Sequence, residues 1–337
     1  MKKKSYLLAA VLFVAAAFAC GAQDVYDVSI SEIACSDPFI LADETDHTYY
    51  MYSTGGGGRV MGRASKDLEH WTKPFVVMQF TDGHWAGARA ESWAAEVHLY
   101  KGKYYLFTTS SDSRHILKEH PEWAESRPQY TKTPFRATQI YVSDSPRGPF
   151  RDFTDNTPHT PLDWASLDGT LYIEDGVPYM VFCREWLDVV DGTMEAVRLP
   201  DDLGVPVEAP FTLFRSSDAP WSKSYDNQGR EDAVHVTDGP FLFHTQTGRL
   251  GMIWSAWEGD QYCLAAAYSL SGRLYGPWVQ ERRPLYDRNG GHGMIFRDFS
   301  GALRLCFHVV RPDDPRKARR PVVWYLDDST DRLLIKQ

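Results

Sequence analysis

The chain has 337 residues, with 45 acidic and 36 basic side chains and a formal net charge of −9. That length suits one large domain or two ordinary ones, and aromatic residues, 14% of the sequence and present all along it, favour a single β-rich core. Because no basic cluster is of the kind that neutralises phosphates, we expect no nucleic-acid partner.

Residues 1–23 have the features of an export signal. A basic start, Lys2 to Lys4, precedes an apolar run from Leu7 to Ala19 that is too short to span a bilayer. The residues before Cys20 resemble a lipoprotein cleavage box, which would make Cys20 an acylated anchor; cleavage near Gln23 would instead give a soluble form. We therefore expect an exported protein without a membrane span, either periplasmic, secreted or tethered at the cell surface as a lipoprotein.

Residues 24–337 are interpreted as one domain built from five repeats. Each repeat begins with a residue that can handle a proton or a cation, which we call its head, followed by an apolar strand, a turn and a second strand. The heads are Asp37, Glu96, Asp168, Asp238 and His292, at intervals of 59, 72, 70 and 54 residues. Repeats of this order with several short strands are typical of β-propellers. The sequence therefore predicts an all-β fold, a five-bladed β-propeller whose heads converge on its axis.

The connecting segments are predicted in chain order. Residues 24–33 are expected to form a lead-in strand that completes the last blade. An insertion in the second blade, residues 111–133, is rich in charge, His and Pro, and we interpret it as a long loop. Residues 216–231 form another expected loop, and residues 311–320, with five basic side chains, are interpreted as a solvated turn of the last blade.

Strand direction predicts which residues surround the heads. If each head begins an inner strand, the second strand returns to the same end, and the residues after it should form a rim. That rim would combine carboxylates and Arg, which grip hydroxyl groups, with Trp, which stacks on a sugar ring. We therefore expect an oligosaccharide or polysaccharide ligand, and the predicted substrate-binding residues are Trp93, Glu96, Glu185, Trp186, Trp257 and His292.

Five polar heads in one funnel are suited to acid–base hydrolysis. Inverting glycoside hydrolysis needs one ionised carboxylate to activate water and one protonated carboxyl group to protonate the leaving oxygen, ~6.5–9.5 Å apart. Crowded carboxylates resist joint ionisation, which raises the pKa of one of them. A propeller axis that gathers such heads could supply both groups.

Five short motifs follow one another in the chain: Cys35-Ser36-Asp37-Pro38-Phe39-Ile40, Trp93-Ala94-Ala95-Glu96-Val97, Leu167-Asp168-Gly169-Thr170, Thr237-Asp238-Gly239-Pro240-Phe241 and Gly291-His292-Gly293. In this order they resemble the blade signatures of glycoside hydrolase family 43. The resemblance covers nearly all of the mature chain. It implies a five-bladed propeller that removes arabinofuranose or xylose, less often galactose, with inversion.

The resemblance also implies roles for the heads. Asp37 would be the general base, Asp168 would tune and orient the acid, and Asp238 would be the acid. The family acid is usually a Glu in a Glu-Gly-Pro motif, so Asp238 is one methylene shorter than the usual residue. Glu185 on the expected rim is the alternative acid, and Glu231 in a nearby loop is a weaker candidate.

His292 has two interpretations of equal weight. In the family, a His at this place often helps to coordinate a cation or a water on the axis, which would make His292 a ligand of a calcium or sodium ion. A lone His is otherwise more often a hydrogen-bonded core residue. We expect no required cofactor and a monomeric protein.

Three functions follow from these observations. The leading hypothesis is an exported, exo-acting α-L-arabinofuranosidase that acts on plant cell-wall polysaccharide or oligosaccharide. A β-xylosidase or exo-galactosidase is the alternative within the same family. A non-catalytic, glycan-binding propeller is the alternative of another class, and the Asp at position 238 is its best support.

Overall fold

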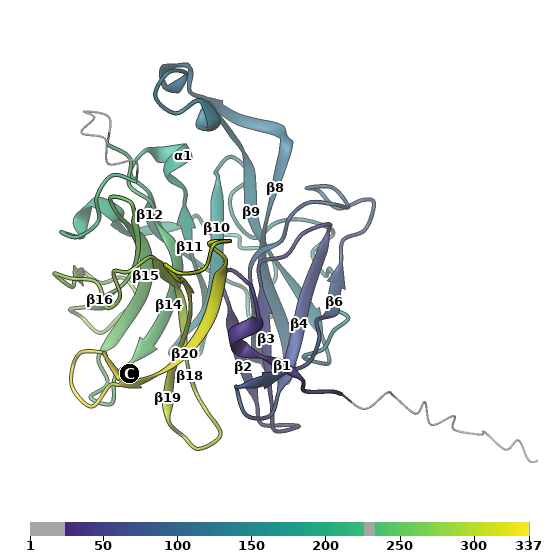
Figure 1. Ribbon diagram of the computed structural model, residues 1–337. Coiled ribbons are helices and arrows are strands. Elements are labelled where there is room, and N and C mark those ends of the chain that lie inside the picture. Colours follow the sequence, from purple (N-terminus) through teal and green to yellow (C-terminus); the bar gives the residue numbers. More distant parts are fainter. Residues whose placement is uncertain (1–23, 226–232, 337) are drawn as a thin grey trace, which may run out of the picture.

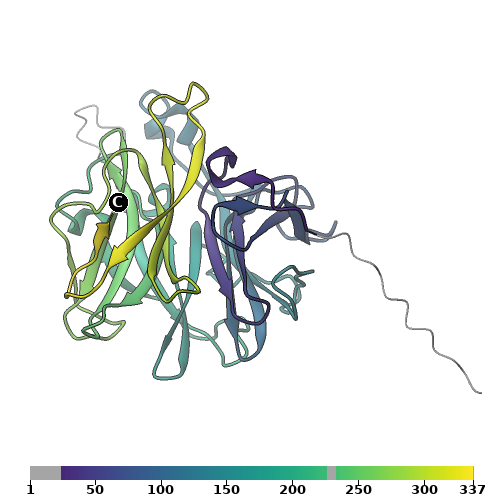
Figure 2. The ribbon, with the colours of Figure 1, turned by 60° about the horizontal axis from the view of Figure 1, so that its bottom comes forward.

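The computed structural model describes residues 24–225 and 233–336, so the expected export signal and Glu231 lie outside the described residues. Five sheets follow one another along the chain and surround a common axis (Figures 1 and 2). Each inner strand contacts the next, and the last contacts the first. The inner strands are β2 (Phe39–Asp43), β7 (Trp93–Tyr100), β10 (Ser166–Glu174), β14 (Asp238–His244) and β18 (Gly290–Arg297). The fold is a five-bladed β-propeller, as predicted.

The outer strands of each blade pair antiparallel in sequence order, so every second strand returns to the end of the axis where its inner strand begins. The second blade adds β8 (Lys103–Glu119) and β9 (Lys132–Ser143). The third blade adds β11 (Val177–Arg184), β12 (Thr193–Arg198) and β13 (Phe211–Arg215). The fourth adds β15 (Leu250–Glu258), β16 (Gln261–Ser269) and β17 (Trp278–Gln280). The fifth adds β19 (Leu303–Val310), β20 (Arg319–Asp327) and β21 (Leu334–Lys336).

The first blade corrects the expectation for the lead-in segment. Its outer strands are β3 (Thr48–Ser53), β4 (Arg59–Ser65), β5 (His70–Trp71) and β6 (Phe75–Gln79). Strand β1 (Val28–Ser29) pairs with β5 and so belongs to this blade instead of completing the last one. The residues after β1 contact the last blade: Arg320 Nη1 donates to the carbonyls of Ser31 (3.2 Å) and Ile33 (3.4 Å), and the amide of Cys35 donates to the carbonyl of Arg319 (3.0 Å).

The insertion of the second blade is also more regular than expected. Strands β8 and β9 continue their pairing through most of it, up to Glu119 opposite Lys132, and form a long hairpin that rises above the five sheets (Figure 1). Two short 3₁₀ turns, Pro121–Trp123 and Pro128–Tyr130, form its tip. The expected loop is therefore mainly a strand extension.

Neighbouring blades pack through large apolar side chains, which fixes their relative orientation. Trp254 of the fourth blade is fully buried, and its ring centroid lies 4.9 Å from Trp221 and 5.3 Å from Phe214 of the preceding segment. The single α-helix among the described residues, α1 (Trp186–Val189), has four residues. No helix in this part of the chain is long and apolar enough to cross a membrane.

A recurring backbone kink places the site residues. In each of the last four blades the inner strand has a bulge at its start, and the first bulged residue has a positive φ: Ala94 (46°), Asp168 (58°), Gly239 (51°) and His292 (50°). Asp37, just before β2, has the same conformation (54°). Such bulges re-aim side chains and persist for non-glycine residues only where the surroundings hold them.

The surroundings that hold these kinks come from the preceding blade. The amide of Ala94 donates to Thr54 Oγ1 (3.0 Å), that of Asp168 to Thr109 Oγ1 (2.9 Å), and that of His292 to Ser255 Oγ (2.8 Å). The amide of Asp37 donates to His308 Nδ1 of the last blade (3.2 Å). For Gly239 the acceptor is Asp168 Oδ2 (3.0 Å). These five hydrogen bonds form a closed ring around the axis, which we call the amide ring.

Candidate active site

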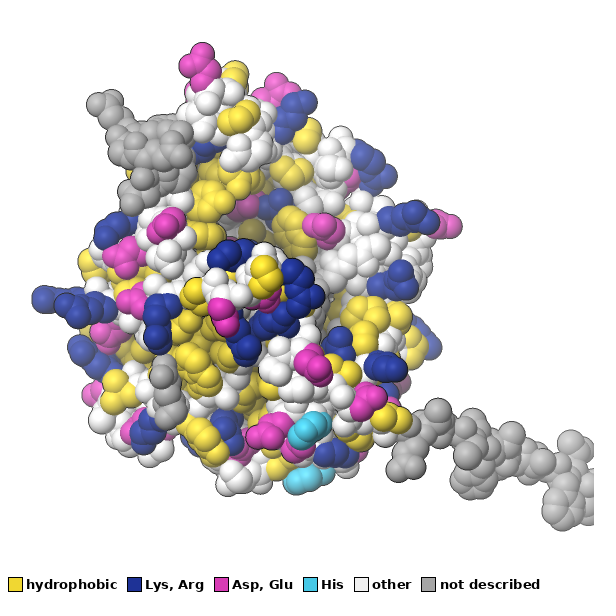
Figure 3. All heavy atoms as spheres, viewed as in Figure 1, with side chains coloured by type: hydrophobic (Ala, Val, Ile, Leu, Met, Phe, Trp, Pro, Cys, Tyr) yellow, Lys and Arg dark blue, Asp and Glu magenta, His cyan; other side chains and the backbone are white. Residues whose placement is uncertain are grey.

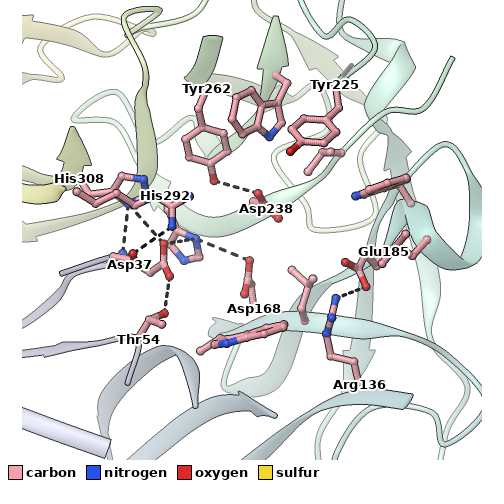
Figure 4. A pocket seen from close by; sticks show the side chains of 18 of the residues that line it. Asp37, Thr54, Arg136, Asp168, Glu185, Tyr225, Asp238, Tyr262, His292 and His308 are labelled. Carbon is pink, nitrogen blue, oxygen red and sulfur yellow. Dashed lines mark hydrogen bonds and ion pairs between the residues drawn. The ribbon is translucent and has the colours of Figure 1, made fainter. Parts of the chain in front are cut away.

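A cavity of about 370 Å³ opens at the end of the axis where the inner strands begin (Figure 4). It brings together the three predicted catalytic residues, Asp37, Asp168 and Asp238. It also contains five of the six predicted substrate-binding residues, namely Trp93, Glu185, Trp186, Trp257 and His292.

Asp37 lies in a setting that favours its ionised form. Its Oδ2 accepts a hydrogen bond from the hydroxyl of Thr54 (2.5 Å), and its Oδ1 is 3.4 Å from His292 Nδ1. Burial alone would raise the pKa of Asp37, but the charge of His292 and the contacts with His308 and Thr54 outweigh it and hold the pKa below the usual carboxyl range. Asp37 is therefore a carboxylate that can accept a proton from water.

His292 supplies positive charge at the centre of the site. Its Nδ1 lies 3.4 Å from Asp37 and 3.8 Å from Asp168, so the ring bridges the two carboxyl groups. Burial disfavours the charged ring, but the carboxylates of Asp37, Asp168 and Asp238 outweigh burial and raise the pKa of His292. The imidazolium is thus the central cation of the site.

Asp168 and Asp238 form a pair that holds a proton. Burial is the largest cause that raises the pKa of both groups. Repulsion from Asp238 and Asp37 adds to it for Asp168, and repulsion from Asp37 and Glu185 adds to it for Asp238, although the charge of His292 acts in the opposite direction. Asp168 accepts from the amide of Gly239 (3.0 Å), and Asp238 accepts from the hydroxyl of Tyr262 (3.1 Å). At neutral pH, a proton on this pair is available for transfer.

Glu185 faces the same cavity in a different setting. Its carboxylate forms a close ion pair with Arg136, whose guanidinium lies 4.3 Å from the ring centroid of Trp93. Burial raises the pKa of Glu185, while the Arg136 guanidinium favours the ionised form. A carboxylate held by an arginine is better suited to gripping hydroxyl groups through the pair than to releasing a proton.

Glu96 does not line the cavity, unlike the other four heads, although its charge acts on His292 and helps to raise the pKa of that ring. It is buried and its Oε2 lies 2.9 Å from His98 Nε2. The bulge explains the difference: the position equivalent to Asp37 and Asp168 is occupied by Ala94, two residues earlier. Asp238 is likewise displaced, one residue before Gly239 at the kink, but its side chain still faces the cavity.

Several lining residues escaped sequence reasoning: Tyr130, Arg136, Tyr225 and Tyr262. Tyr262 opens strand β16, which begins where β15 ends, so the first residues of the third strands were a usable signal. Tyr130 lies on the tip of the β8–β9 hairpin and Arg136 within β9, where no repeat marks them. Tyr225 belongs to the expected loop between the third and fourth blades.

The expected calcium or sodium ion at His292 stays a prediction that the geometry does not favour. Across residues 24–225 and 233–336, no group of three or more His, Cys, Asp or Glu side chains is placed to hold a metal ion. His292 Nδ1 faces the carboxyl groups of Asp37 and Asp168. The residues present do not fit a directly ligated ion there, so the chemistry below is derived from side chains alone.

Comparisons with known proteins agree with this architecture. A model of the family described as glycosyl hydrolases family 43 matches residues 26–324. A solved endo-arabinase from Bacteroides thetaiotaomicron VPI-5482 is 35% identical, with 89% of this chain and 96% of that chain covered and a TM-score of 0.76.

Two further solved structures share the fold at lower identity. An endo-1,4-beta-xylanase from the same organism is 24% identical, with 90% of this chain and 95% of that chain covered and a TM-score of 0.68. An alpha-L-arabinofuranosidase from Lactobacillus brevis is 19% identical, with 89% and 94% covered and a TM-score of 0.62. Among curated proteins, none matches the chain significantly.

Proposed function

Because the chain belongs to glycosyl hydrolase family 43, we propose that it hydrolyses α-L-arabinofuranosyl bonds of plant cell-wall polysaccharide or oligosaccharide with inversion, and that it acts from the chain end. Family membership establishes a glycosidase with a carbohydrate substrate. The arabinose specificity is supported by the 35% identity to a protein described as an endo-arabinase. Export, as a secreted or lipid-anchored protein, is part of the same proposal.

One observation carries the mechanism: carboxyl groups of opposite pKa shift face a single cavity. The pKa of Asp37 is held low, and those of Asp168 and Asp238 are raised. Inverting hydrolysis needs an ionised base and a protonated acid at the same pH. Figure 4 shows Asp37 on one side of the cavity with His292 beside it, Asp238 and Asp168 near the middle, and Glu185 on the opposite side.

The reaction follows from these positions. Asp37 removes a proton from a water molecule, which attacks the anomeric carbon of the bound sugar. Asp238 donates its proton to the leaving oxygen as the glycosidic bond breaks, and the product sugar has the inverted configuration. Asp168 shares the proton of the pair with Asp238, and His292 keeps Asp37 ionised through its positive charge.

We assign the acid to Asp238 in preference to Glu185. Burial raises the pKa of both groups, so the choice rests on their partners: the carboxyl group of Asp238 accepts from the neutral hydroxyl of Tyr262. Glu185 is bound to Arg136, which stabilises the ionised form and opposes protonation. Glu185 is therefore a substrate-binding residue in this proposal, together with Trp93, Trp186 and Trp257.

The test is incubation with defined arabinan, arabinoxylan and galactan oligosaccharides, with analysis of products over time and of the first-formed anomer by NMR. Release of single arabinose units with inverted configuration is the expected result. Release of xylose or galactose would change the proposed sugar specificity but leave the protein a glycosidase. Release of oligosaccharides from within arabinan would show that the protein cleaves internal bonds instead of acting from the chain end.

A non-catalytic, glycan-binding propeller gives a different outcome. Such a protein would bind an oligosaccharide without turnover, and Asp37→Asn would leave its affinity unchanged. Measuring binding by calorimetry beside the product analysis separates this function from hydrolysis.

A further inference from the structure

A second cavity, of about 610 Å³, opens beside the active site on the Asp37 side. We call it the side groove. It shares its inner wall with the catalytic cavity, formed by Ser36, Thr54, Trp257, Tyr262, His308 and Arg319. A ligand that fills the catalytic cavity can therefore continue into the side groove without leaving the surface of the protein.

The charge of the side groove is opposite to that of the catalytic cavity. No carboxylate lines it, whereas Lys317 and Arg319 both do. Each is exposed and makes only neutral hydrogen bonds among the described residues: Arg319 Nη1 donates to Ser36 Oγ (3.2 Å), and Lys317 Nζ donates to the carbonyl of Pro312 (3.2 Å). Neither forms an ion pair with a described residue. Their positive charge is available to a ligand.

Two other basic residues of the same segment, Arg316 and Arg320, are already paired, which distinguishes them from Lys317 and Arg319. Arg320 is buried and forms an ion pair with Asp314 (2.9 Å), and Arg316 lies 3.8 Å from the same carboxylate. The expectation of a solvated turn therefore holds for only part of residues 311–320. In Figure 3, basic side chains gather at the middle of the face, over the loop between β19 and β20.

Aromatic rings line the path from the catalytic cavity into the side groove. The rings of Tyr262 and His308 are nearly parallel (5°) with centroids 5.6 Å apart, and Trp257 lies 5.2 Å from Tyr262. Flat ring faces of this kind suit the apolar face of a sugar. Burial lowers the pKa of His308 and keeps its ring neutral, so the positive charge of the groove comes from Lys317 and Arg319.

We propose that the side groove binds a uronic acid unit of the substrate, next to the sugar held in the catalytic cavity. A guanidinium binds a carboxylate through two parallel hydrogen bonds, and an ammonium adds a point charge. With a net charge of −9, the protein as a whole repels an acidic glycan, so two local cations beside the site favour this position over others. This inference rests on the proposed function and narrows its substrate to acidic arabinose-bearing glycans.

The experiment compares two ligands that differ only in charge. The probes are arabinoxylo-oligosaccharides that carry a glucuronic acid side group, and the same oligosaccharides after reduction of the carboxyl group to a primary alcohol. We measure affinity by calorimetry with the Asp37→Asn protein, and kcat/KM with the wild type, at low and high NaCl. The acidic probe should bind and react roughly threefold to tenfold better, and NaCl should remove this preference, as for exposed ion pairs.

Variants assign the preference to the two cations. In the calorimetry, Arg319→Gln and Lys317→Gln, each combined with Asp37→Asn, should each reduce the ratio of affinities for the acidic and reduced probes, and both together should bring it to one. Lys73→Gln, which removes an exposed charge outside both cavities, should leave the ratio unchanged. Thermal unfolding curves verify that the variants are folded.

The possible failures can be told apart. The uronic acid assignment is overturned if the protein without groove substitutions binds both probes equally. It is also overturned if the preference for the acidic probe persists in the double variant. Neither result affects the proposed function, which hydrolysis of neutral oligosaccharides tests separately. Absence of hydrolysis on every oligosaccharide overturns the proposed function, and the calorimetric ratio still reports on the groove.

Discussion

Asp37 in the first blade and Asp168 in the third have the same residue type and the same kinked backbone, with φ of 54° and 58°, yet their pKa values move in opposite directions. Asp37 receives a hydroxyl hydrogen bond from Thr54 and lies 3.4 Å from His292. Asp168 receives one amide hydrogen bond, lies 3.8 Å from His292 and is close enough to Asp238 for repulsion.

The difference shows that the repeat determines where each carboxyl group lies, whereas the neighbouring side chains determine its pKa. Burial pushes both carboxyl groups toward the protonated form. Hydrogen bonds and the nearer cation reverse this on the Asp37 side, while a second carboxyl group reinforces it on the Asp168 side. The predictions below test the two sides separately, in order of expected effect.

Removal of the ionised carboxylate on the first-blade side should have the largest effect. Asp37→Asn should lower kcat by about 10²–10⁴-fold, the usual contribution of a general base, because amide nitrogen cannot accept the proton of water. The measurement is kcat on the best arabinosyl substrate, with thermal unfolding to establish that the fold is intact. Activity within tenfold of the wild type would remove Asp37 from this role.

Removal of the acid should depend on the leaving group. Asp238→Ala should slow a natural oligosaccharide by about 10²-fold or more and an activated aryl glycoside far less, because a good leaving group needs little protonation. Glu185→Ala, the matched comparison, should weaken both substrates alike through loss of binding. If Glu185→Ala shows the leaving-group dependence and Asp238→Ala does not, the acid comes from the end of β11.

Neutralisation of the third-blade partner should change the pH profile as well as the rate. In Asp168→Asn, Asp238 no longer shares a proton with a second carboxyl group, so the ionisation with the higher pKa is removed from the pair. The basic limb of kcat/KM, which reports loss of the acid's proton, should then move to lower pH. We expect about a tenfold or larger loss of kcat near neutral pH. An unshifted basic limb would contradict the pairing of the two carboxyl groups.

Loss of the central cation should have the smallest effect on the rate and should act on both limbs. In His292→Gln the positive charge that lowers the pKa of Asp37, Asp168 and Asp238 is gone, so the pKa values of all three carboxyl groups should rise. Both limbs of kcat/KM should move to higher pH, with less than about a tenfold change at the maximum. An acidic limb that stays in place would contradict the role of His292 in keeping Asp37 ionised.

The sequence predicted the propeller, and four of the five heads line the cavity as expected, because apolar strands and polar heads recur at regular intervals. Glu96 does not line the cavity because the bulge places Ala94 at the kinked position, and a shift of one or two residues cannot be read from composition. Arg136 was missed because no local motif marks it. Only the folded chain places Arg136 of β9 beside Glu185, which follows β11 in the next blade. The two unpaired cations of the side groove appeared only once the partners of Arg316 and Arg320 were known.

The amide ring has a consequence for how activity is lost on denaturation. Each kinked residue is held by an acceptor from the blade before it, and the last blade holds the first. A partly unfolded form that lacks any one blade therefore lacks the acceptor that holds the kink of the next blade, and the ring of hydrogen bonds around the site is open. Enzymatic activity should thus be lost when the first of the five blades unfolds. This loss should come before, or together with, the loss of the circular-dichroism signal of the β-strands. Activity therefore reports whether all five blades are folded.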